Sequence, residues 1–81
     1  MTFTKLIKTI KRNEWFMRKG CNTIYIFSND GKLEYASVFW DRAAQGTDLL
    51  WNDFHAKDWV ILCNVKSDLE QRRTTFEIKQ Q

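Results

Sequence analysis

The chain has 81 residues, 43% of them hydrophobic and 15% aromatic, and carries a formal net charge of +3. This length suits one domain with a single hydrophobic core and excludes most large catalytic architectures. The apolar content and the lack of proline exclude a disordered tail, and the basic balance does not suit an acidic mimic of DNA. With four Trp and six Phe in so small a domain, some aromatic side chains are expected in a subunit interface or ligand pocket.

The first predicted element is an amphipathic helix over residues 3–12. Apolar side chains recur along it at steps of three and four residues, namely Phe3, Leu6, Ile7 and Ile10. Thr2 or Thr4 is expected to cap its start, and Asn13 to end it in a left-handed conformation. Because the helix is short, we expect it to lie on a sheet.

Two strands are predicted next, over residues 23–28 and 32–40, where β-branched and aromatic residues are frequent. Between them the tripeptide Asn29-Asp30-Gly31 contains Asp-Gly, which tolerates the positive φ angles of a tight turn. The pattern therefore predicts a β-hairpin.

Residues 41–47 are small and polar, which predicts a loop or a loose helical turn. Thr47 or Asp48 has the chemistry to cap a short helical segment that reaches about Phe54. The apolar run 59–63 has the length of a central strand.

Residues 67–73 are predicted to form a polar connection or helical turn, and 74–78 an edge strand. Residues 64–81 as a whole either extend the sheet or wrap a neighbouring subunit. The fold class is therefore α+β, a single domain with an N-terminal amphipathic helix packed on a small, mostly antiparallel sheet.

Cys21 and Cys63 are too few for a disulfide framework, and with His55 as the only histidine they do not make a zinc site. We expect both to be buried, reduced thiols. Signal-peptide and membrane-spanning patterns are lacking, which predicts a cytoplasmic protein. The three glycines are too dispersed for a phosphate-binding loop, and His55 with Asp53 and Asp58 is a weak catalytic set, so an enzyme is not expected.

Polar residues suited to nucleotide binding lie near tryptophans in the sequence. Aromatic faces stack on bases, arginine pairs with phosphate, and Asn, Gln or Asp can bind base edges and ribose hydroxyls. The polar set is Arg18, Lys19, Asn22, Gln45, Thr47 and Asp48, and the tryptophans are Trp15, Trp40 and Trp51.

The segment 3–26 reads FTKLIKTIKRNEWFMRKGCNTIYI, in which Arg18, Gly20 and Asn22 follow the amphipathic helix and precede the hairpin. Farther along, Trp40 is followed by AAQGTDLL, and Asp58-Trp59 leads into the apolar run. Over most of residues 3–62 this order resembles the second Thoeris anti-defence family of phage and prophage proteins.

The resemblance implies small homo-oligomers, dimers or tetramers, that sequester cyclic nucleotide signals without catalysis or cofactors. The signal is chiefly the glycocyclic ADP-ribose of the bacterial Thoeris system, some relatives bind cyclic dinucleotides, and some are type II-A CRISPR inhibitors. Arg18 would meet a phosphate and Trp40 would form a wall of the site. The implied contacts to ribose or base are those of Asn22, Gln45, Thr47 and Asp48.

The sequence departs from the family at two points. Cys21 replaces a tryptophan that follows the glycine, and Trp15 could supply the missing aromatic face. The second departure is in the family's Asp-Trp pair, which follows an Asp-Leu-Leu-like run. Asp53-Phe54 matches that pair by its spacing from Asp48, whereas Asp58-Trp59 matches it by residue identity and requires an insertion.

Local roles also account for several of these residues: Arg18 on a solvated strand end, Asn22 in a turn and Asp48 as a helix cap. A second functional hypothesis is an anti-CRISPR-like inhibitor that contacts a host defence protein through Trp15 or Trp51. A third is nucleic-acid binding through the basic N-terminal segment, by Lys5, Lys8, Lys11 and Arg12.

Overall fold

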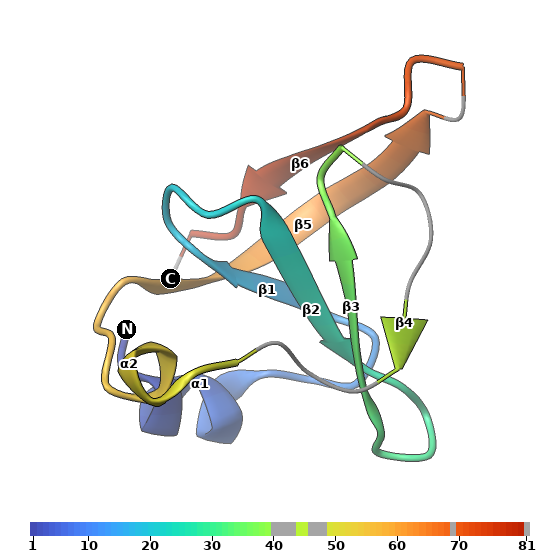
Figure 1. Ribbon diagram of the computed structural model, residues 1–81. Coiled ribbons are helices and arrows are strands. Elements are labelled where there is room, and N and C mark those ends of the chain that lie inside the picture. Colours follow the sequence, from blue (N-terminus) through green and yellow to red (C-terminus); the bar gives the residue numbers. More distant parts are fainter. Residues whose placement is uncertain (40–43, 46–48, 69, 81) are drawn as a thin grey trace.

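The computed structural model describes residues 1–39, 44–45, 49–68 and 70–80, and these residues have an α+β fold. The described strands form one antiparallel sheet in the order β4-β3-β2-β1-β5-β6, and a short N-terminal helix packs on it (Figure 1). This confirms the predicted α+β class and the helix packed on an antiparallel sheet. The strands are β1 (Trp15–Arg18), β2 (Thr23–Phe27), β3 (Leu33–Ser37), β4 (Ala44–Gln45), β5 (Trp59–Asp68) and β6 (Arg73–Ile78).

Helix α1 (Phe3–Thr9) begins where the capping pattern predicts and ends earlier than expected. The hydroxyl of Thr2 accepts a hydrogen bond from the backbone N–H of Lys5 at 3.2 Å, so Thr2 is the cap. Ile10 is already extended, and Asn13 has the predicted left-handed conformation, with a φ of 68°. The prediction of helix to residue 12 is wrong because the chain must turn here to enter β1.

The β2–β3 hairpin confirms the turn prediction. Tyr25 lies opposite Tyr35 in an unbroken register, and Gly31 has a φ of 80° in the turn. The predicted loop at 41–47 is wrong in part, because Ala44 and Gln45 form β4 and pair with β3.

Strand β1 lies between β2 and β5, although the sequence did not predict a strand there. Its residues Phe16 and Met17 are both buried, on opposite faces of the sheet. A central strand that is covered on both faces has a continuous apolar run. It lacks the alternation of apolar and polar residues by which a half-buried strand is predicted.

Strand β5 continues well beyond the apolar run that predicted it and forms a hairpin with β6. Ser67 and Asp68 belong to β5 and Arg73 to β6, so the predicted polar connection is confined to a shorter turn. The backbone N–H of Thr74 donates to the carbonyl of Val38 at 2.7 Å, which brings this hairpin over to the end of β3. Residues after 63 therefore extend the sheet. Residues 74–78, predicted as an edge strand, belong to the edge strand β6.

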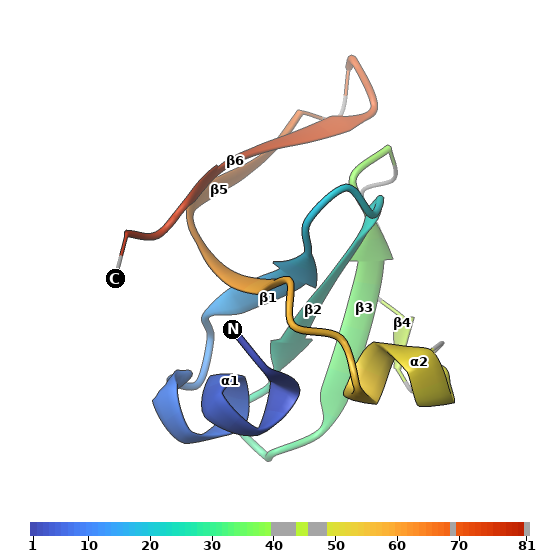
Figure 2. The same cartoon turned by 90° about the vertical axis from the view of Figure 1, so that its left-hand side faces the viewer.

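The sheet has a hydrophobic cluster on each face. The first lies under α1 and consists of the buried residues Leu6, Phe16, Tyr25, Trp59 and Ile61. The second consists of Met17, Ile24, Ala36 and Leu62, and Val65 and Phe76 of the β5–β6 hairpin pack against it. Figures 1 and 2 show α1 and α2 at one end of the molecule and the hairpin tip at the other.

Within the described ranges, no helix is both long and apolar enough to cross a membrane. Both cysteines are free thiols. Cys63 is half-buried, but Cys21 is exposed in the turn after β1, so the prediction that both would be buried is wrong for Cys21. That turn is closed by a hydrogen bond from the Cys21 N–H to the carbonyl of Arg18, which leaves the side chain outside the core.

Candidate functional site

Arg18 stands at the junction of β1, β5 and the short helix α2 (Trp51–Phe54), where it binds two carboxylates. Its Nε donates to Asp58 Oδ1 at 2.9 Å and its Nη1 donates to Asp53 Oδ1 at 2.7 Å. The contact from Nη2 to Asp58 Oδ2 is longer, at 3.4 Å. We call these three residues the Arg18 cluster.

Sheet register and helix capping position the cluster. Arg18 ends β1 and lies opposite Trp59, the first residue of β5, so Asp58 falls beside it. Asp53 is held in α2, where its carboxylate accepts the N–H of Leu50 at 2.8 Å and its carbonyl accepts Trp59 Nε1–H at 2.8 Å. The buried Trp59 ring therefore fixes α2 on the sheet.

The cap of α2 differs from the prediction. Leu50 is the N-cap residue, with an extended backbone, rather than Thr47 or Asp48. The Asp53 carboxylate accepts the Leu50 N–H from inside the helix, and the Asp53 N–H donates to the Leu50 carbonyl at 2.9 Å, so these two residues close the first turn on each other.

The charges in the cluster stabilise one another. Hydrogen bonds to Asp58 and then to Asp53 raise the pKa of Arg18 above its ordinary value. The pKa of Asp58 is lowered chiefly by the hydrogen bond from Arg18. The pKa of Asp53 is lowered first by the Leu50 N–H and then by Arg18. The side chains remain 28% exposed for Arg18 and 40% for Asp58, so solvent weakens the bridge.

These pKa directions predict an acid-sensitive contribution to stability. Both carboxylates have a lower pKa in the folded state, so their contribution is present above about pH 4 and is lost as the pH falls through the folded values. In Arg18→Gln we expect a flatter fall of unfolding free energy between about pH 5 and 2, measured by urea denaturation at each pH. Arg73→Gln, on an exposed strand position, is the control; equal flattening in both variants would contradict the prediction.

The structure brings together only part of the predicted site. Asn22 is exposed in the bend after β1, four residues from Arg18, and its carbonyl accepts the Val38 N–H at 2.7 Å. Trp40, Thr47 and Asp48 lie outside the described residues.

Gln45 lies far from Arg18 in the sheet. Its backbone pairs with Glu34 of β3, and Glu34 in turn pairs with Ile26 of β2. Ile26 pairs with Trp15, which lies at the opposite end of β1 from Arg18. Strands β2 and β3 also separate the two positions. With strands about 4.8 Å apart and residues about 3.3 Å apart along a strand, their backbones are roughly 17 Å from each other. One copy of the chain therefore does not place Gln45 beside Arg18.

Trp15 does not replace the aromatic face missing at Cys21. It lies at the start of β1 and packs against the second hydrophobic cluster, on the face of the sheet opposite Phe16 and Arg18. An exposed apolar surface is found instead at α2, where Trp51 is 76% and Phe54 46% exposed and the N-cap residue Leu50 is 70% exposed.

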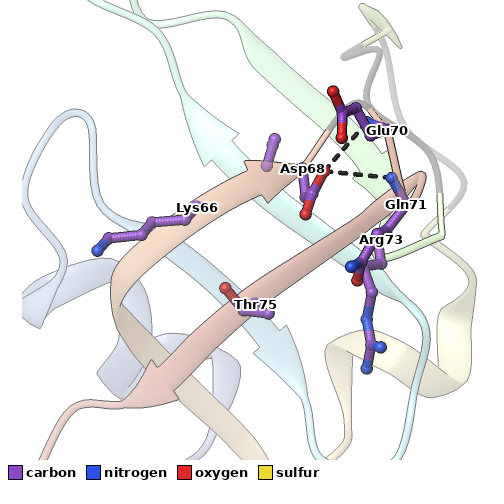
Figure 3. Close-up of a pocket in the computed structure, with 7 residues that line it drawn as sticks. Lys66, Asp68, Glu70, Gln71, Arg73 and Thr75 are labelled. Atoms are coloured by element: carbon purple, nitrogen blue, oxygen red, sulfur yellow. Dashed lines mark hydrogen bonds between the residues drawn. The ribbon is translucent and has the colours of Figure 1, made fainter.

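A broad groove of about 780 Å³ lies at the tip of the β5–β6 hairpin, away from the Arg18 cluster (Figure 3). Figure 3 shows Asp68 turned toward the turn, where its carboxylate accepts the N–H groups of Glu70 and Gln71 at 3.0 and 3.1 Å. The groove is lined by Lys66, Ser67, Asp68, Glu70, Gln71, Arg73 and Thr75. Its charges are mixed, and it contains none of the predicted site residues.

The sequence does not predict that Asp53 and Asp58 bind Arg18; it offers them only as a weak catalytic set with His55 and as alternative matches to a family motif. The local signals at Asp58 are its place directly before the apolar strand and the match of Asp58-Trp59 to the family motif. Its contact with Arg18 spans 40 residues and depends on the β1–β5 register.

The polar and aromatic groups of this region already contact one another. His55 contacts the ring of Trp51, with centroids 4.4 Å apart, and both carboxylates of the cluster are engaged by Arg18. Among the described residues, no group of three His, Cys, Asp or Glu side chains is placed to hold a metal ion. No protein-family model and no curated protein matches the sequence, and no solved structure matches the fold.

Proposed function

We propose that this chain is a phage-type anti-defence protein that binds and sequesters a cyclic nucleotide immune signal without catalysis. The signal is of the glycocyclic ADP-ribose type or a cyclic dinucleotide. One observation carries the proposal: the two segments that resemble the Thoeris anti-defence family meet at one place. Arg18 binds the Asp58 carboxylate at 2.9 Å, and the Lys19 N–H donates to the Asp58 carbonyl at 3.0 Å.

The same contact favours one of the two alignments of the second motif. Asp58-Trp59 leads directly into β5, and Trp59 is fully buried beneath α1. Asp53-Phe54 belongs to α2. In the alignment that matches Asp58-Trp59 to the family, α2 lies in the segment inserted relative to the family. Asp53 nevertheless reaches the same guanidinium, so both candidate aspartates support the position of Arg18.

A homo-oligomeric site between copies in the host bacterial cytoplasm accounts for two further observations. Strand pairing places the backbones of Arg18 and Gln45 at distant positions of the sheet in one chain, whereas residues from two copies can face each other across an interface. In addition, Trp51 presents an exposed ring on the helix that carries Asp53, where a base or a second copy can stack on it.

Arg18 would act by exchanging partners. Its carboxylate bonds hold the guanidinium in place before a ligand arrives, and the long Nη2–Asp58 contact is the weakest of them. A ligand phosphate can take over such a donor because phosphate matches the fork of the guanidinium.

The proposal is tested by native mass spectrometry of the protein, alone and with glycocyclic ADP-ribose isomers and cyclic dinucleotides. We expect a homo-oligomer that gains the mass of one of these ligands. Arg18→Ala should weaken that binding about 10- to 100-fold, the range for a charge-assisted hydrogen bond. Asp48→Ala should also weaken it, and Arg73→Ala, an exposed arginine on the distant hairpin, should not. No binding at micromolar concentration would sink the proposal.

The exposure of Trp51 and Leu50 also supports a second candidate, an inhibitor that contacts a host defence protein directly. This candidate predicts no small-molecule ligand. Trp51→Ala would then abolish inhibition, whereas Arg18→Ala would leave it intact.

A further inference from the structure

A second hollow lies between the end of α1 and the β2–β3 turn, at the end of the sheet opposite Arg18. We call it the α1–Phe27 pocket; it measures about 270 Å³ and is lined by Ile7, Ile10, Lys11, Arg12, Phe27 and Gly31. Figures 1 and 2 place α1 and the β2–β3 turn at the same end of the molecule.

Hydrogen bonds hold the two walls of this pocket together. Arg12 Nη1 donates to the carbonyl of Asn29 at 2.8 Å, and the side chains of Asn13 and Asn29 bond at 2.9 Å. The Asn13 N–H donates to the carbonyl of Phe27 at 3.3 Å. The pocket is therefore formed before a ligand arrives, as small-molecule sites generally are.

The floor of the pocket is apolar and continuous with the core. Ile10 and Phe27 pack against the first hydrophobic cluster, and the ring of Phe27 stacks on buried Phe16 with centroids 5.6 Å apart. Ile7 is 43% exposed at the rim, in the middle of a helix. A hollow of about 270 Å³ that is open to solvent above an apolar floor has room for one substituted ring or a short aliphatic chain.

The rim is cationic, and among the described residues neither Lys11 nor Arg12 forms a side-chain ion pair within 4.0 Å. The pKa of Glu14 is lowered chiefly by the hydrogen bond from Lys79, and the Lys11 charge lowers it further. The nearby carboxylate of Glu14 is already bound by Lys79 Nζ at 2.9 Å and by the Lys11 backbone N–H. Asp30, in the turn, is engaged by Ser28 and Lys32. The side chain of Lys11 and the remaining donors of Arg12 thus face solvent beside an apolar floor.

From this combination we propose that the α1–Phe27 pocket binds a small anion that carries an apolar group, namely an aromatic or short aliphatic carboxylate or phosphate monoester. The apolar group would lie on Ile7, Ile10 and Phe27. The anionic group would reach Lys11 and the free donors of Arg12, which Asn29 already holds in position. The site is separate from the Arg18 cluster and does not depend on the function proposed above.

The test is a titration of ¹⁵N-labelled protein with 1-naphthyl phosphate, followed by amide shifts in NMR spectra. We expect saturable shifts at the amides of the pocket residues, with a dissociation constant on the order of 1 mM or lower. The neutral 1-naphthol and inorganic phosphate should each bind about tenfold more weakly, because each lacks half of the interaction.

Matched variants separate the pocket from general electrostatics. Lys11→Gln with Arg12→Gln should weaken binding about tenfold, whereas Lys8→Gln, on the preceding helix α1 and outside the pocket, should change it less than about twofold. Ile7→Gln should weaken binding, and Ile78→Gln, at an equally exposed isoleucine, should not. Arg18→Ala should have no effect.

Four results would overturn the inference, the first three of which concern the pocket itself. These three are shifts that do not saturate, 1-naphthol binding as tightly as its phosphate, and equal losses in Ile7→Gln and Ile78→Gln. Shifts centred on the Arg18 cluster would likewise reject the pocket, although they would favour the function proposed above.

Discussion

Trp59→Ala is expected to lower the free energy of unfolding by about 3–5 kcal/mol. The side chain is fully buried and joins three aromatic neighbours, with ring centroids 5.2 Å from Phe3, 5.8 Å from Phe16 and 5.9 Å from Tyr25. Its indole N–H also binds the Asp53 carbonyl, so alanine removes both a core ring and the tether of α2.

A loss of that size is a large part of the total stability of a small domain, which is about 5–15 kcal/mol. Urea denaturation followed by circular dichroism measures it. Trp51→Ala is the matched control, because that ring is 76% exposed, and it should change stability by no more than about 0.5 kcal/mol. Equal losses in the two variants would contradict the assignment of Trp59 to the core.

Leu6→Ala is expected to cost about 2–5 kcal/mol and to release α1 from the sheet. Leu6 is the buried residue of α1. Its side chain has no solvent exposure and packs in the first hydrophobic cluster. An isolated helix of seven residues does not persist in water, so docking of this side chain sustains the helix.

Hydrogen exchange distinguishes local release from global unfolding in this variant. We expect the amides of α1 to lose protection before those of β2 and β3. Ile7→Ala, at the neighbouring position with 43% exposure, should cost less than about 1 kcal/mol. A variant of Leu6 that keeps full protection in α1 would argue against the role given to this residue.

The parts of the fold that local chemistry determines could be predicted from sequence. Asp30-Gly31 specified the hairpin, and Thr2 specified the start of α1. The end of α1 and the existence of β1 depend on tertiary structure instead. The chain leaves the helix early so that Phe16 and Met17 can each fill the core on one face of the sheet.

The site divides in the same way. Arg18 was singled out by its place in a motif, but its carboxylate partners come from segments 35 and 40 residues away. Only the β1–β5 register brings them together, and a pattern within either segment does not encode that register. Strand pairing also places Gln45 level with the start of β1, opposite the end that carries Arg18, and no local pattern in the sequence indicates this separation.

The position of β5 beside β1 also sets the order in which the chain can fold. The β2–β3 hairpin is local and can form within microseconds, but β1 has a free edge until residues 59–68 have been synthesised. Before then α1 lacks Trp59 and Ile61 beneath it, so the N-terminal half cannot close its core. We therefore expect cooperative folding only after most of the chain has left the ribosome, at the slower rates typical of non-local strand pairing.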